Sequence, residues 1–144
     1  MLHSAHAVHS YFTFRLKQMK TYQYQLLRYT HDHVTGEFMN VGLVFYEPTT
    51  GLLCAKVISS TKRLCAFFSD LSAEYLLADL HYFAQRINGH DQISLTTLTP
   101  PLENITATLI RPNDGALQLM PVAKGLSGTL LQTFGSLYQR LVNE

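Results

Sequence analysis

Residues 21–30 and 37–46 both predict β-strands, in which successive side chains point to opposite faces. In the second segment both faces of the extended chain carry apolar residues, which indicates a strand in the middle of a sheet covered on both sides. The polar segment 31–36 ends in glycine and predicts an antiparallel hairpin with a longer loop. A turn at residues 47–51 and an apolar run at 52–58 extend the hairpin to a three-stranded meander.

Helical periodicity follows the third strand. Residues 62–68 predict a short helix, and residues 73–88 predict a longer helix with one apolar stripe. Residues 116–122 predict a short strand at the edge of the sheet, and residues 130–141 a last amphipathic helix. We therefore expect an α+β domain with an antiparallel sheet of three to four strands, packed with three to four helices.

Residues 102–110 fit two periods. Apolar residues at a spacing of three and four suit a helix, whereas the alternation of Ile105, Ala107 and Leu109 suits a strand. Pro101 is favourable in the first turn of a helix, so we prefer the helix and keep the strand as the alternative.

Composition and charge limit the compartment and the class of partner. The chain has 47% hydrophobic residues, and its formal net charge is +1. Because its basic residues are scattered, nucleic-acid binding is not expected. No apolar run reaches the roughly 20 residues of a membrane span, and no signal-peptide core is seen, so we expect a cytoplasmic protein without a membrane segment. Cys54 and Cys65 are then expected to be buried, reduced thiols.

Residues 1–18 show no clear period, and Met19 opens a stretch that reads as a natural start. We expect an N-terminal extension at 1–18, either a flexible arm or an amphipathic strap, followed by one domain at 19–144. The three histidines of the extension are three residues apart and would drift around a helix. No metal site is expected there.

Polar residues interrupt the apolar pattern around the first hairpin. Glu37 begins the doubly covered strand and Asn40 lies inside it, where both need partners. Arg28 before the hairpin loop and Arg63 in the following helix are the nearest donors. Together with Asp32, these residues form either an ion-pair network that fixes the hairpin or a pocket that grips an anionic ligand.

Acid–base residues gather on the hairpin loop, where His31 and His33 flank Asp32. If the pocket were catalytic, Glu37, Asp32 and His31 would be the candidate acids or bases. One His-x-His pair is a weak metal signal, so no metal is predicted. The segment 124–129 precedes a helix but lacks the spacing of a nucleotide loop, so helix capping explains it. No cofactor is expected.

Motifs of the first strands and the short helix are spaced as in a known family. They are Tyr22-x-Tyr24, Leu27-Arg28-Tyr29, His31-Asp32, Glu37-Phe38-x-Asn40-Val41-Gly42 and Arg63-Leu64. With them the chain resembles DUF3037, a bacterial family of unknown function, most densely over residues 21–70. His31 stands where members often carry proline. The resemblance implies a small cytoplasmic protein, and because members are often encoded beside HipA-like kinases, it implies such a kinase as partner in a toxin–antitoxin setting.

The apolar composition therefore predicts a non-enzymatic interaction module or accessory subunit. Its partner is expected to be a second copy of the chain or, as the resemblance implies, a HipA-like kinase. The alternative is a small enzyme or binding protein for a phosphate- or carboxylate-bearing molecule, held by Arg28 and Arg63 with Glu37 or Asp32 as acid or base. Geometry separates the two hypotheses. An open cleft lined by Glu37 and both arginines favours a ligand, and a sealed network favours a scaffold.

Overall fold

The structure of the chain is a computed structural model that describes residues 18–89, 100–110 and 115–142. Among these residues, five strands form one antiparallel sheet and four helices pack with it, so the α+β class is confirmed. The sheet has one strand more than expected, because residues 123–127 form a strand in place of a capping segment. In chain order the elements are β1 (Lys20–Asp32), β2 (Glu37–Glu47), β3 (Leu52–Val57), α2 (Lys62–Phe67), α3 (Ala73–Asn88), α4 (Leu102–Ala107), β4 (Leu117–Leu119), β5 (Ala123–Ser127) and α5 (Leu130–Leu141).

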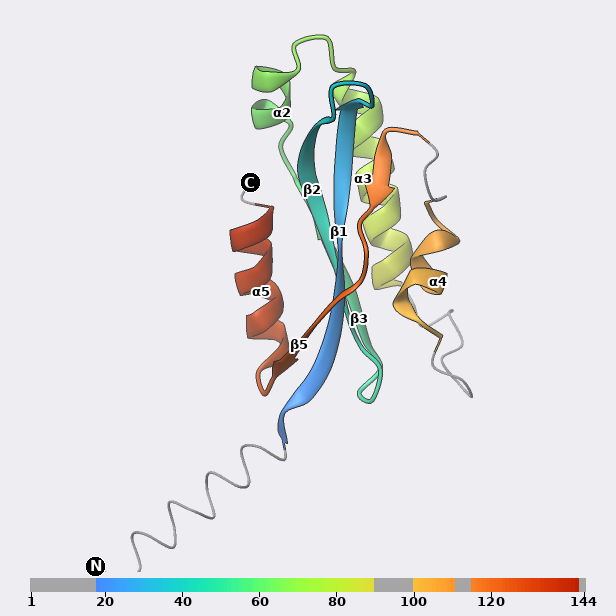
Figure 1. The fold of residues 1–144 in the computed structure, drawn as a ribbon, viewed down its shortest axis with the longest axis vertical. Helices are drawn as coiled ribbons and strands as arrows, with labels where there is room; N and C mark the ends of the chain where they lie inside the picture. The colour runs from blue at the N-terminus through green and yellow to red at the C-terminus, as the bar shows by residue number, and fades with distance from the viewer. Residues whose placement is uncertain (1–17, 90–99, 111–114, 143–144) are drawn as a thin grey trace, which may run out of the picture.

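The sheet is ordered β3-β2-β1-β4, and β5 also pairs with β1. β4 and β5 share one edge of β1, because β4 lies along residues 27–29 of that strand and β5 along residues 20–24. α5 lies on one side of the sheet and α3 and α4 on the other (Figure 1). β1 and β2 are therefore the interior strands, as predicted for β2, and residues 102–107 form the preferred helix.

Two irregularities interrupt the pairing of β1 with β2. Val41 has no partner on β1, so Asn40 lies opposite Arg28. Simple alternation would place Asn40 on the face of Gly42, but the bulge turns it to the other face, toward α5. At the far end of β1, His31 is the extra residue of the second irregularity. Each irregularity involves a predicted site residue, Asn40 in the first and His31 in the second.

Gly42 of β2 lies close to its neighbours on both sides, β1 and β3. A Cβ atom at this position would lie 3.0 Å from Val57 Cγ1 and 3.2 Å from the carbonyl oxygen of Lys56. We expect Gly42→Ala to lower the free energy of unfolding by about 1–2 kcal/mol, since overpacking forces the strands apart. Urea unfolding followed by circular dichroism measures this change.

Gly135 in α5 is the matched control for this substitution. No atom lies within 4 Å of a Cβ placed there, and alanine is the better helix former. Gly135→Ala is expected to raise the free energy of unfolding by up to about 1 kcal/mol. Equal effects of the two substitutions would contradict the packing of β2.

The two cysteines were expected to be buried, reduced thiols. Both cysteines are free. Cys54 is half-buried, and burial raises the pKa of its thiol to about 11. Cys65 is exposed, so the expectation of two buried thiols was wrong for this residue, which lies on the solvent side of the short α2. Residues 1–17 of the expected extension, including its three histidines, fall outside the described residues. None of the described helices has the length and apolarity of a membrane span.

Candidate functional site

Arg28 and Asn40 form the centre of the predicted polar cluster. They lie opposite one another on β1 and β2, and Arg28 Nε donates a hydrogen bond to Asn40 Oδ1 over 3.4 Å. The guanidinium carbon also lies 3.6 Å from the centre of the Phe38 ring, which is a cation–π contact. Burial lowers the pKa of Arg28 from its ordinary value, but an arginine stays charged in such a setting. The guanidinium is thus packed against the sheet.

The cluster reaches the last turn of α5. Asn40 Nδ2 donates to the carbonyl oxygen of Leu141 over 3.0 Å, and Arg63 donates to that of Val142 over 3.4 Å. Carbonyls at the end of a helix lack helical partners and carry partial negative charge, so an amide and a guanidinium suit them. Asn40 and Arg63 therefore hold the end of α5 to β2 and α2.

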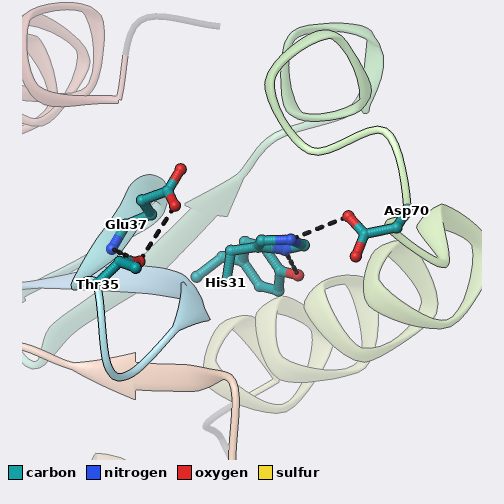
Figure 2. Close-up of polar contacts among 5 residues, drawn as sticks. His31, Thr35, Glu37 and Asp70 are labelled. Carbon is teal, nitrogen blue, oxygen red and sulfur yellow. Dashed lines mark hydrogen bonds and ion pairs between the residues drawn. The ribbon is translucent and has the colours of Figure 1, made fainter.

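Asp32 and Glu37 lie at the strand ends that flank the hairpin loop. Asp32 Oδ1 accepts hydrogen bonds from the backbone N–H groups of Val34 and Thr35, which shapes the turn. Glu37 is exposed, and its carboxylate accepts a hydrogen bond from the Thr35 hydroxyl over 3.1 Å (Figure 2). The expectation of a buried Glu37 was wrong, because the continuously buried part of β2 begins only at Val41.

A groove of about 490 Å³ opens beside this cluster, and we call it the arginine groove. Its described lining combines polar residues of the cluster with two phenylalanines that are 48% and 69% exposed. Arg28 and Asp32 are not among the described lining residues, and a second guanidinium comes instead from the last turn of α5. The polar and exposed aromatic residues of its lining are Glu37, Asn40, Arg63, Arg140, Phe38 and Phe67, and Met39, Phe68, Leu141 and Val142 complete it.

His31, a predicted acid or base, is held between two partners and above a ring. Its Nε2 lies 3.0 Å from Asp70 Oδ1, and its Nδ1 lies 2.8 Å from the Tyr29 hydroxyl oxygen. The ring stacks on Phe68 with centroids 4.3 Å apart and planes 16° apart. Figure 2 shows the imidazole pointing toward Asp70, which comes from the segment before α3. Burial and the charge of Asp70 raise the pKa of Tyr29, so the phenol keeps its proton at neutral pH.

A second cavity, of about 550 Å³, is lined by Tyr29, His31 and Asp70, and we call it the Tyr29 pocket. Leucines of four segments and Phe83 supply much of its apolar wall. Its polar lining includes Tyr29, His31, Asp70, Asp79 and Tyr82. Sequence reasoning missed Tyr29 and Asp70, because only the fold brings the segment before α3 to the end of β1.

Among the described residues, the carboxylate that enters the interior is that of Glu47, at the opposite end of β2 from Glu37. Glu47 is 0% exposed and accepts hydrogen bonds from the backbone N–H groups of Thr49 and Thr50 and from the Thr49 hydroxyl. Burial alone would raise the pKa of Glu47, but these hydrogen bonds outweigh it, so the pKa lies below its ordinary value. A turn, and not a pair of arginines, satisfies this buried acid. In the sequence, the Glu-Pro-Thr-Thr-Gly turn is the pattern that indicates these donors.

We also searched the described part of the chain for metal-ligating clusters. No group of three or more His, Cys, Asp or Glu side chains is arranged there to hold an ion.

Comparison with known proteins identifies the family. No curated protein and no solved structure matches the chain. The model of a family described as "Protein of unknown function (DUF3037)" matches residues 24–142, from within β1 to the residue that follows α5. This match covers most of the chain and agrees with the motifs of the first hairpin. The chain therefore belongs to the DUF3037 family.

Proposed function

We propose that this protein is an interaction module or accessory subunit that docks a protein partner in the arginine groove. The observation that supports this function is the combination of two exposed phenylalanine rings, Phe38 and Phe67, with the guanidiniums of Arg63 and Arg140. Aromatic rings and arginine are the residue types that concentrate binding energy at protein interfaces. Full burial of a phenylalanine stabilises a complex by about 1.5–3 kcal/mol.

The charges of the groove favour a partner segment that carries carboxylates. Two guanidiniums face one carboxylate, that of Glu37, in the described lining. A guanidinium pairs with a carboxylate through two parallel hydrogen bonds, which fixes the orientation of the partner. A HipA-like kinase, the partner that the family resemblance implies, is the first candidate, and a second copy of the chain is the next.

A small molecule with a phosphate or carboxylate group is the second candidate function. The volume of the groove lies within the range of small-ligand sites. Such a ligand would be held by Arg63 and Arg140, with Glu37 as the acid or base, since Arg28 is packed against Phe38. Titration with inorganic phosphate tests it, and phosphate binding that Arg140→Gln abolishes would favour this candidate over docking.

A matched pair of variants tests the docking function. Phe67 in α2 and Leu131 in α5 are each 69% exposed, but only Phe67 lines the groove in the described part of the chain. The wild-type protein is used to recover a partner from the native host, and the affinity of that partner is then measured by calorimetry. Phe67→Ser is expected to weaken binding about ten-fold or more, whereas Leu131→Ser leaves it unchanged.

Two results would contradict docking in the groove. One is equal affinity of both variants for the recovered partner. The other is a wild-type protein that stays monomeric in gel filtration and binds neither a HipA-like kinase nor any other protein of the native host.

A further inference from the structure

The hydrogen bonds of the Tyr29 pocket have fixed directions when the imidazole of His31 is neutral. The charged Asp70 carboxylate only accepts, so the Nε2 of His31 must carry the proton in the 3.0 Å contact between them. In a neutral imidazole the other nitrogen is then an acceptor, and Nδ1 takes the hydrogen bond that the Tyr29 hydroxyl donates over 2.8 Å. The phenol proton is thereby committed to His31. Toward the pocket, the Tyr29 oxygen has only lone pairs to offer.

The two carboxylates of the described lining have the same polarity, whereas the exposed hydroxyls of Ser72 and Tyr82 can donate as well as accept. Asp79 of α3 is exposed at the pocket and accepts hydrogen bonds only, as does Asp70. The ring of Tyr82, which is 61% exposed, adds an aromatic face that attracts cations. Behind these groups, apolar side chains such as Phe83 and Leu117 form a wall for an uncharged body.

We propose that the Tyr29 pocket binds a small organic amine, with a protonated amino group on an apolar body. The ammonium group donates hydrogen bonds to the Tyr29 oxygen and to the carboxylate of Asp79. Its apolar body packs on the leucines and Phe83 of the wall. A cavity of about 550 Å³ is of the size that encloses such a molecule. This assignment is independent of partner docking, which uses the arginine groove.

An anion is disfavoured at the same place for two reasons. The carboxylates of Asp70 and Asp79 would repel it, and the one buried hydroxyl of the described lining, that of Tyr29, has no proton left to donate. A comparison of the affinities of an amine and a carboxylate of the same shape therefore tests the proposal most sharply.

The test uses two probes with nearly the same body, 2-phenylethylamine and 3-phenylpropionate, titrated into the full chain and followed by NMR. The amine is expected to bind about ten-fold tighter or more than the carboxylate, with shifts centred on the lining residues of α3 and β4. Tyr29→Phe removes the acceptor oxygen and is expected to weaken amine binding about ten-fold. Tyr75→Phe, on the exposed side of α3, is the matched control and leaves binding unchanged.

Several outcomes would overturn the assignment. They are equal affinity for the two probes, binding of neither, and a Tyr29→Phe protein that binds the amine as the wild type does. If that variant does not fold, Asp79→Asn at the surface serves instead, with an expected loss of about five-fold. Tighter binding of Nα-acetyl-lysine methylamide than of phenylethylamine would also overturn it, since the ammonium group would then come from a protein lysine.

Discussion

Replacing Glu47 with alanine is expected to lower the free energy of unfolding by about 3 kcal/mol. The substitution leaves two backbone N–H groups and the Thr49 hydroxyl without their acceptor, and a hydrogen bond to a charged group contributes about 1.5–3 kcal/mol. Urea unfolding at neutral pH measures the change. Glu103→Ala, at an exposed acid in α4, is the matched control and is expected to change stability by less than about 0.5 kcal/mol.

The same carboxylate predicts how stability depends on pH. Because the pKa of Glu47 is lower in the folded protein than in the unfolded chain, its contribution is fully present above the unfolded pKa. That contribution is lost as the pH falls through the folded value. Glu47→Gln cannot titrate, so its stability is expected to fall less steeply than that of the wild type below about pH 4. Parallel curves for the two proteins would show that Glu47 titrates normally.

Replacing Asn40 with alanine is expected to destabilise the protein by about 2 kcal/mol and to loosen the end of α5. The variant loses the hydrogen bond to the Leu141 carbonyl and the acceptor of the Arg28 side chain. Each partly buried hydrogen bond contributes about 1 kcal/mol. Hydrogen exchange of α5 amides, followed by mass spectrometry, is expected to rise in the last turn more than in the first.

The control for this experiment is Asn104→Ala, an exposed amide in α4. It is expected to leave both the stability and the exchange of α5 unchanged. If Asn40→Ala also leaves α5 exchange unchanged, the amide does not fasten the helix.

Local patterns predicted the sheet because alternation, turn residues and helical stripes are properties of short segments. The hairpin, the meander and the long helix α3 follow from such patterns. β5 was missed because Ala123–Ser127 contains a glycine and few β-formers, and it pairs because the exposed edge of β1 needs a partner. The ring of Tyr22 packs over that glycine, Gly125, on the neighbouring strand. No local pattern in the sequence predicts this cross-strand contact.

The geometry of the candidate cluster differs from the prediction in its partners. Asn40 was predicted to need a partner and Arg63 to be a nearby donor, but both donate to backbone carbonyls at the end of α5, which no side-chain pattern reveals. Strict alternation failed at Val41, because a one-residue bulge reverses the face of everything before it. The pairing of His31 with Asp70 depends on tertiary packing, and no local signal precedes it.

Glu37 and Glu47 show why an acid at the end of a strand is hard to assign. They are the first and last residues of the same apolar strand. The sequence does not indicate how much of the strand the helices cover. The burial of β2 is continuous from Val41 to Glu47, so the acid at its far end is enclosed and the acid at its start is not. Two threonines two and three residues after Glu47 are the signal that separates them.

The most direct test of partner docking is amide chemical-shift mapping of the isotope-labelled chain with the recovered partner. The proposal predicts that the largest shifts cluster on the arginine groove, at Phe38, Phe67 and Arg140. Shifts centred instead on the exposed Leu126 and Leu131, or none at saturating partner, would contradict it.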